Sequence, residues 1–215
     1  MNAASAPELA NLQDDVLREI AAHGQVRKFQ KNAVIIQEGD VGDSLYIILS
    51  GRVKVYASDD NGREVIIEIF GPGEYVGEMG VLDGGPRSAS VMTLEPSVFS
   101  VLTRNELRDH IVEHPDFAIY VIARLIKRTR NSTNNIKTLA LMDVYGRVAR
   151  FLLNLAVEQD GKMIVPEKFT HQEIAERVGS SREMITRILK DLSTGGYIEV
   201  RDRTIIMNRR PPAHW

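Results

Sequence analysis

The feature that most constrains this fold is a stretch over residues 116–142 that contains neither glycine nor proline. Without a helix-breaking residue, the stretch predicts one uninterrupted helix. At about 1.5 Å per residue, that helix would be roughly 40 Å long. Such a helix is too long to serve merely as a connector, and the sequence patterns on its two sides differ.

Short strands are expected before this helix. After a short amphipathic helix around residues 12–22, residues 33–57 alternate apolar and polar positions between Gly-Asp and Ser-Gly turn signals. This alternation is typical of antiparallel strands. A second strand pair is expected at residues 64–70 and 89–101, followed by a helix over residues 104–114. The N-terminal part is therefore predicted to be a sheet domain.

The long helix has a strict three-four spacing, which predicts the seam of a two-stranded coiled coil. The seam is apolar at both ends and polar in its middle, and its members are Ala118, Val121, Leu125, Arg128, Ser132, Asn135, Leu139 and Met142. The alternative is an ordinary amphipathic helix that packs on its own sheet. Buried polar seam positions need partners, and a ligand lodged between sheet and helix would supply them.

A helix-turn-helix is predicted after this long helix. Asp143 is a good N-cap for a helix over residues 145–159, and a short strand pair is expected at residues 161–169. Two capping boxes follow, one from Thr170 to Glu173 and one from Ser180 to Glu183, with Val178 and Gly179 between their helices. Two capped helices joined by a tight turn are typical of a helix-turn-helix.

The second helix of this pair has side chains suited to the DNA major groove. At 100° per residue its apolar residues share one side, and Arg182, Glu183, Thr186 and Arg187 share the other. Arginine can bond bidentately to guanine, and glutamate can accept from cytosine N4. A hairpin around residues 201–202 follows and would lie beside the phosphate backbone as a wing.

Composition excludes several classes of protein. The chain has no cysteine, which excludes disulfides, cysteine-ligated zinc and an iron–sulfur cluster held by cysteine. There is no apolar run near 18 residues, so a cytoplasmic protein without a membrane span is expected. The net charge is −2, yet residues 144–215 contain 12 basic and 9 acidic side chains, which places a small basic excess in the helix-turn-helix part.

No enzyme or metal site is predicted. No arrangement of serine, histidine and aspartate or of paired carboxylates can be argued for catalysis. Four histidines show no metal-ligand spacing and are expected at the surface or at helix ends: His23, His110, His114 and His214.

Residues 77–89 read GEMGVLDGGPRSA and suit a cyclic phosphate. A phosphate diester needs a fixed cation, hydroxyl and backbone donors and small residues that allow close approach, while a ribose hydroxyl needs a carboxylate acceptor. The run resembles the phosphate-binding cassette of cyclic-nucleotide-binding domains in the CRP/FNR family of regulators. Gly39, Asp40, Gly51 and Val53 fall where that family has its turns, and LALMDVYGRVARFLLNLA and SSREMITRILKDL resemble its hinge and recognition helix.

The resemblance implies an α+β chain with three parts: an N-terminal cyclic-nucleotide-binding β-roll (residues 1–115), a dimerisation helix (116–142) and a C-terminal winged helix-turn-helix (143–215). It implies cyclic AMP as the allosteric ligand, with no metal, haem or iron–sulfur cluster. The implied ligand-binding residues are Gly77, Glu78, Met79, Arg87, Ser88, Arg128, Ser132 and Thr133. The implied DNA-binding residues are Thr170, His171, Gln172, Ser181, Arg182, Glu183 and Arg187.

The implied assembly is a homodimer on a palindromic operator in double-stranded DNA, with RNA polymerase as a further partner. Three alternatives stay open. The first is a regulator of the same fold that responds to cyclic di-GMP or to no nucleotide. The second is the regulatory subunit of a cyclic-nucleotide-controlled enzyme or channel, and the third is a catalytic protein.

Overall fold

The protein is described by a computed structural model that covers residues 9, 12–159, 161–201 and 204–211. It divides into two compact units, residues 1–127 and residues 128–215, and each unit is described by itself. The division lies within helix α5 (Pro115–Leu141). This element confirms the long helix expected over residues 116–142. Its first residue is a proline, which suits this position because the missing N–H would have no partner inside the helix.

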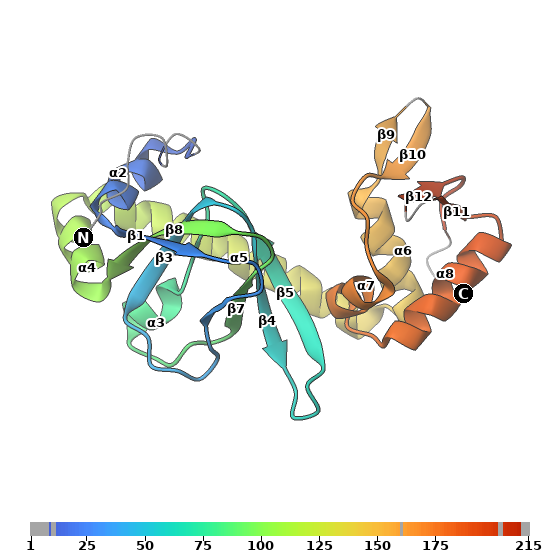
Figure 1. Cartoon of the computed structure of the whole chain (residues 1–215), viewed down its shortest axis with the longest axis horizontal. Helices are drawn as coiled ribbons and strands as arrows, with labels where there is room; N and C mark the ends of the chain where they lie inside the picture. Colours follow the sequence, from blue (N-terminus) through green and yellow to red (C-terminus); the bar gives the residue numbers. More distant parts are fainter. Residues whose placement is uncertain (1–8, 10–11, 160, 202–203, 212–215) are drawn as a thin grey trace. The chain divides into compact units, whose positions relative to one another are not determined.

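Two antiparallel sheets form the centre of the first unit (Figure 1). One sheet has the strand order β1-β8-β3-β6 and the other has the order β2-β7-β4-β5. The strands are β1 (Gln25–Phe29), β2 (Val34–Ile36), β3 (Ser44–Ser50), β4 (Val53–Ser58), β5 (Glu64–Phe70), β6 (Tyr75–Val76), β7 (Ser90–Thr93) and β8 (Ser97–Thr103). Within the described part of this unit the structure also has helices α2 (Asp15–His23), α3 (Glu78–Asp83) and α4 (Arg104–Glu113).

The predicted strand pairing is wrong for residues 64–70 and 89–101. β5 pairs with β4, and residues 89–101 divide into β7 and β8, which belong to different sheets. The break between β7 and β8 includes Pro96. Proline has no N–H to donate to a ladder, so the chain leaves one sheet here and enters the other.

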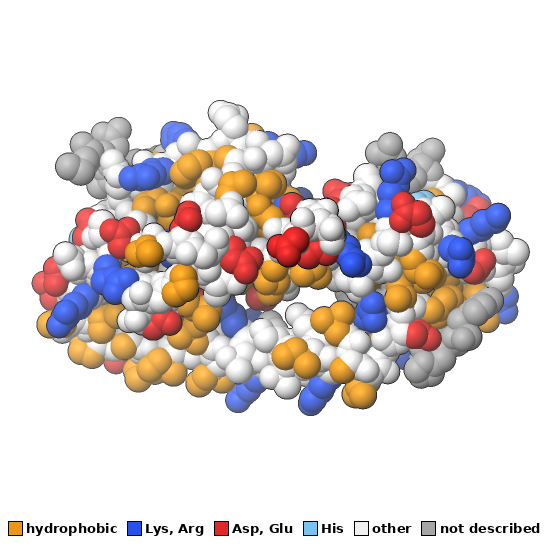
Figure 2. Space-filling view, turned by 90° about the horizontal axis from the view of Figure 1, so that it is seen from below, with side chains coloured by type: hydrophobic (Ala, Val, Ile, Leu, Met, Phe, Trp, Pro, Cys, Tyr) orange, Lys and Arg blue, Asp and Glu red, His pale blue; other side chains and the backbone are white. Residues whose placement is uncertain are grey.

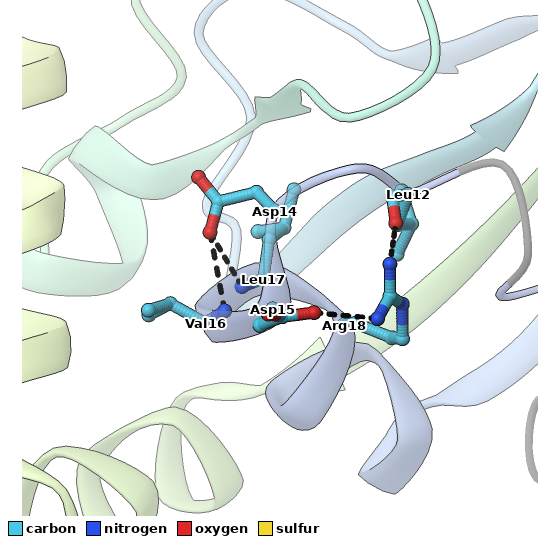
Figure 3. A network of polar contacts seen from close by, with 6 residues as sticks. All are labelled: Leu12, Asp14, Asp15, Val16, Leu17 and Arg18. Carbon is cyan, nitrogen blue, oxygen red and sulfur yellow. Dashed lines mark hydrogen bonds and ion pairs between the residues drawn. The ribbon is translucent and has the colours of Figure 1, made fainter.

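Helix α2 begins later than expected because Asp14 caps it (Figure 3). The Asp14 carboxylate accepts hydrogen bonds from the N–H groups of Val16, at 3.1 Å, and Leu17, at 3.5 Å. Arg18 binds Asp15 at 2.5 Å and also donates to the carbonyl oxygen of Leu12. The two bonds accepted by Asp14 satisfy N–H groups that lack partners inside the helix.

Helix α5 packs on its own unit along one side, which corrects part of the predicted seam. Val121 is buried with α2, α4 and β3 in the first hydrophobic core, and Leu125 packs against the same cluster. The large apolar side chains of α5 that are exposed in this unit are instead Ile119, Ile122 and Ile126. Exposed hydrophobic side chains lie among charged ones in Figure 2. Two apolar stripes share this helix, and spacing alone could not tell which one faces the sheet.

The second unit contains the predicted helix-turn-helix and a four-stranded sheet of order β11-β12-β10-β9. Its elements are α6 (Val144–Leu155), β9 (Val157–Gln159), β10 (Lys162–Val165), α7 (His171–Val178), α8 (Arg182–Thr194), β11 (Ile198–Arg201) and β12 (Thr204–Met207). The wing strands are thus present, while the turn at residues 202–203 lies outside the described residues. Helices α6, α7 and α8 and the sheet contribute to one hydrophobic core.

Two boundaries before the helix-turn-helix differ from the prediction. α6 ends at Leu155 rather than residue 159, and the strand pair is formed by β9 and β10 rather than by residues 161–169. Ala156 already has extended backbone angles, and Gly161 turns the chain at a φ of 73°. Asp143 caps α6 as expected, because its carboxylate accepts from the N–H of Gly146 at 2.7 Å. None of the described helices is long and apolar enough to cross a bilayer.

Candidate anion-binding cassette and nucleic-acid interface

Arg87 is the buried centre of the predicted cassette, with 7% of its surface exposed. Its guanidinium donates to two backbone carbonyl oxygens, that of Gly77 at 2.6 Å and that of Ser44 at 2.8 Å. Its backbone is fixed as well, since its N–H donates to Asp40 and its carbonyl accepts from Gly39. Among the described residues no carboxylate pairs with this cation. A buried guanidinium held only by carbonyls is suited to bind an anion.

Glycines make room for this guanidinium. A Cβ on Gly42 would lie 1.9 Å from the Arg87 Nε, and a Cβ on Gly77 would lie 2.5 Å from its Nη1. Gly77 also has a φ of 87°, a left-handed conformation that favours glycine, where the chain passes from β6 into α3. Gly77 is therefore required both by its backbone conformation and by the close approach of the Arg87 guanidinium.

The other cassette residues surround α3. Glu78 begins this helix and is 5% exposed, whereas Met79 and Ser88 are exposed. The Ser88 hydroxyl lies 3.5 Å from the Met79 sulfur. The structure thus brings Gly77, Met79, Ser88 and Arg87 together around one short helix.

Sequence reasoning missed residues that hold the cassette from a distance. Arg104, at the start of α4, donates from Nη2 to the carbonyl oxygen of Gly80 in α3 at 2.8 Å. Ser44 is the first residue of β3, and Gly42 lies in the loop just before that strand. The alternating pattern of residues 33–57 predicts strands, but it does not indicate that Ser44 and Gly42 contact Arg87.

Arg128, Ser132 and Thr133 lie on α5 within the second unit, so the cassette is described without them. Ser132 and Thr133 are exposed, and the Thr133 hydroxyl donates to the carbonyl of Thr129 at 3.0 Å. Their expected role in ligand binding stays a prediction.

The helix-turn-helix has the expected turn and one of the expected capping boxes. Thr170 and Glu173 form the capping box of α7, and Gly179 ends this helix with a φ of 67°. The second predicted box, Ser180 to Glu183, is wrong by one residue. Ser181 is the N-cap of α8 and accepts from the N–H of Met184 at 3.2 Å, so the third helical position is a methionine and closes no box.

The outer face of α8 is polar and exposed. Its buried residues are Ile185, Ile188, Leu189 and Leu192, as the helical spacing predicted. Arg182, Glu183 and Arg187 are exposed together with Thr186. Their side chains are accessible for contacts with base edges.

The other predicted DNA-binding residues lie around the beginnings of α7 and α8. Thr170 and Ser181 are the two N-caps, and each accepts a backbone hydrogen bond while its hydroxyl hydrogen remains a donor. Gln172 donates to Glu176 at 2.9 Å. His171 Nδ1 lies 2.8 Å from the Thr186 hydroxyl oxygen on α8, a contact between the two helices that sequence reasoning did not identify.

Arg147 was also missed, although it binds the turn of the helix-turn-helix. From α6 its guanidinium donates to the carbonyls of Val178 at 2.8 Å and Gly179 at 3.1 Å. It also donates to the carbonyl of Met142 at 3.0 Å. One side chain therefore holds the C-terminal end of α7 and the segment that joins α5 to α6.

His110 lies in the last turn of α4, which agrees with the predicted helix end, but its side chain is buried rather than at the surface. It is 6% exposed, and its ring centroid lies 4.6 Å from that of His114 and 5.9 Å from that of His23. Burial lowers the pKa of His110, and His114 lowers it further. Among the described residues no group of three or more acidic, histidine or cysteine side chains could hold a metal ion. His214 lies outside the described residues.

Comparisons with known proteins give two family matches. Residues 26–114 match the cyclic nucleotide-binding domain, and residues 146–211 match the Crp-like helix-turn-helix domain. The chain is 34% identical to a CRP-like cAMP-activated global transcriptional regulator of Mycobacterium tuberculosis over 184 residues, which cover 84% of this chain and 82% of that protein. It is also 34% identical to the cAMP-activated global transcriptional regulator CRP of Haemophilus influenzae over 208 residues, 94% of this chain and 92% of that one.

Solved structures are similar as well. A c-di-GMP responsive global regulator, CLP, of Xanthomonas campestris matches with a TM-score of 0.78 at 29% identity, covering 90% of this chain and 99% of that one. A transcriptional regulator of the CRP/FNR family from Thermus thermophilus matches with a TM-score of 0.65 at 27% identity, covering 85% and 93%. The proteins that this chain resembles are regulators of transcription rather than enzymes.

Proposed function

This chain belongs to the CRP/FNR family of DNA-binding transcription regulators with a cyclic nucleotide-binding domain, and on that premise we propose that it is a homodimer whose DNA binding is controlled by cyclic AMP. The observation that supports a nucleotide ligand is the buried Arg87 cation, whose partners among the described residues are backbone carbonyls. A cyclic phosphate would supply the missing anion.

In this proposal Arg87, Ser88 and the backbone of residues 77–79 hold the cyclic phosphate. Glu78 accepts from the ribose 2′-hydroxyl, and its burial keeps competing water away from that bond. On α5, Arg128 and Ser132 would lie near the base, together with Thr133 of the partner subunit.

Cyclic di-GMP is the second candidate ligand. The similarity to a regulator described as c-di-GMP responsive, at 29% identity, favours it. Cyclic AMP is preferred because the cassette provides one buried arginine and one buried glutamate, which match one cyclic phosphate and one ribose. Cyclic di-GMP has two phosphates and guanine faces that would require further arginine or aspartate side chains.

On DNA, Arg182, Glu183 and Arg187 are proposed to read base edges in the major groove. Thr170, His171, Gln172 and Ser181 are proposed to bind phosphates, which fix the register of the helix on the duplex. The resemblance to the CRP/FNR family implies TGTGA-like half-sites, and a twofold dimer would then prefer a palindrome of two such half-sites about one helical turn apart. The cytoplasm is the proposed location, and RNA polymerase is the proposed further partner.

The proposed control is a shift between two populations of the dimer. Ligand bound against α5 would favour one arrangement of the helix pair, and the segment around Asp143 would then set the spacing of the two recognition helices. The ligand can raise DNA affinity at most by the ratio of its own affinities for the two arrangements. Operator affinity measured with and without nucleotide gives this rise directly.

Calorimetric titration of the full chain with cyclic AMP, cyclic GMP and cyclic di-GMP tests the choice of ligand. We expect saturable binding of cyclic AMP and at least about tenfold weaker binding by Arg87→Lys, because lysine does not reproduce the guanidinium fork. Arg63→Lys, at an exposed arginine paired with Asp59, is the matched control. Binding of cyclic di-GMP without binding of cyclic AMP would reverse the choice of ligand and leave the DNA assignment intact.

A further inference from the structure

The contact between His171 and Thr186 joins the two helices of the helix-turn-helix. His171 is the first residue of α7, and Thr186 lies in the second turn of α8. The ring Nδ1 and the hydroxyl oxygen are 2.8 Å apart, and both residues are exposed on the side of α8 that also holds Arg182. Among the described residues the His171 ring makes no other hydrogen bond, so its Nε2 is available to a molecule outside the chain.

Hydrogen counting fixes which ring nitrogen is protonated. The Thr186 hydroxyl donates to the carbonyl oxygen of Arg182 at 2.9 Å. A hydroxyl has a single hydrogen, so toward His171 its oxygen can only accept. The hydrogen between the two side chains therefore sits on Nδ1. A neutral ring in this state has a lone pair on Nε2 and cannot donate to an anion.

We propose that Thr186 is a positioning residue that holds the His171 ring with Nε2 directed to a DNA phosphate, and that DNA binding consequently takes up one proton from solvent at this nitrogen. A phosphate oxygen only accepts hydrogen bonds, so the contact requires a ring with hydrogens on both nitrogens. The Nδ1 hydrogen stays with Thr186, and the added Nε2 hydrogen goes to the phosphate. This inference rests on the phosphate role proposed for His171.

Charged groups on both helices surround the pair. On α7 the carboxylate of Glu173 accepts from the Thr170 N–H at 2.6 Å, and that of Glu176 accepts from Gln172. On α8 the exposed charged side chains near Thr186 are Arg182, Glu183, Arg187 and Lys190. The variants below leave all of these groups in place, so differences between them report on the ring and the hydroxyl.

The test measures DNA affinity of the full chain between about pH 6 and pH 8, where imidazole titrates, at constant ionic strength. Two duplexes are used, a palindrome with TGTGA half-sites in the presence of cyclic AMP and a random sequence at low salt. We expect wild-type affinity to fall about tenfold across this range, and we expect His171→Gln to lose that dependence because an amide does not titrate.

Thr186→Val should also lose most of the pH dependence, because the released ring can donate from Nε2 while neutral. Thr186→Ser should restore the dependence, and Thr194→Val, the same change at the exposed end of α8, should leave it unchanged. Nitrogen-15 NMR of the free protein should show hydrogen on Nδ1 of His171 in the wild type and a shift toward Nε2 in Thr186→Val.

Equal pH dependence in wild type and His171→Gln would overturn the proposal, and so would a Thr186→Val profile like that of the wild type. A neutral ring with its hydrogen on Nε2 in the free wild type would also overturn the proposal, since the hydroxyl would then be the donor. Loss of preference for the palindrome with the pH effect retained on both duplexes would refute the proposed operator and support this inference, because phosphate contacts are independent of sequence.

Discussion

Space around the Arg87 guanidinium is the property on which the cassette depends most directly. A Cβ on Gly42 would lie 1.9 Å from the Arg87 Nε, and Gly42 has no positive φ, so Gly42→Ala changes space rather than backbone strain. We expect this change to displace the guanidinium and weaken cyclic AMP binding at least about tenfold in calorimetry. Gly71→Ala is the matched control, because its nearest neighbour would lie 4.0 Å away. Equal affinity of the two variants would contradict this account.

His110 makes the free energy of unfolding depend on pH. Burial lowers the pKa of this histidine below its ordinary value, so the unfolded chain binds a proton more readily than the folded one. The stability that the folded protein has with His110 neutral is complete above about pH 6.5, and it is lost as the pH falls toward the lowered pKa. Urea unfolding of His110→Leu should therefore show a smaller loss of stability below about pH 6.5 than the wild type.

Single residues were predictable from the sequence where their partners are neighbours along the chain. Gly77, Glu78 and Arg87 lie within one contiguous motif, so the chemistry they share could be read from its order. The other residues of the cassette could not be found in this way, because Arg87 contacts Ser44 across 43 positions and Arg104 contacts Gly80 across 24. Such contacts depend on the pairing of strands, which the strand pattern alone left undetermined.

Helices and their caps were predicted better than strand pairs. Thr170 with Glu173 and Asp143 cap their helices as expected, because a cap involves residues within one turn. The assignment of residues 64–70 and 89–101 to one strand pair failed, since any apolar strand can pair with several others. The first part of the α5 seam was misassigned for a similar reason, because Val121 and Leu125 pack in the chain's own core.

Arg147 should determine how firmly the end of α7 is held. Its guanidinium satisfies the carbonyls of Val178 and Gly179, which have no partners inside the helix. Arg147→Lys cannot reach both carbonyls and that of Met142 together, so we expect a loss of about 1–3 kcal/mol of unfolding free energy in the second unit. Amide hydrogen exchange across α7 measures this loss. Arg150→Lys, on the same helix and bonded to Thr138, should exchange as the wild type does.

At the scale of the whole molecule, the order of the parts was predictable because periodicity changes along the chain. Alternating positions in residues 33–57 gave way to helical spacing after residue 116, and the capped helix pair came last. The structure places its division inside α5, between residues 127 and 128, rather than at either end of the long helix. The three-part domain assignment stays a prediction.

The proposed dimer should form through the exposed stripe of α5 rather than through the seam expected from spacing alone. Ile122 is 51% exposed, and Ile119 and Ile126 lie one turn away on the same side. Ile122→Asp would place a charge in an apolar interface without removing a core side chain, so we expect sedimentation velocity at micromolar concentration to show a folded monomer. Val112→Asp, at an exposed valine of α4 with 72% exposure, is the control and should remain a dimer.

The monomer produced by Ile122→Asp should also lose its preference for a palindrome over a single half-site, because two recognition helices no longer act together. Its affinity for cyclic AMP should change less than its affinity for the operator, since the Arg87 cassette lies within one chain. Leu125→Asp is a poorer test, because Leu125 packs against the first hydrophobic core and its loss would unfold the subunit as well. A wild-type monomer with ligand present, or a stable Ile122→Asp dimer, would refute this interface.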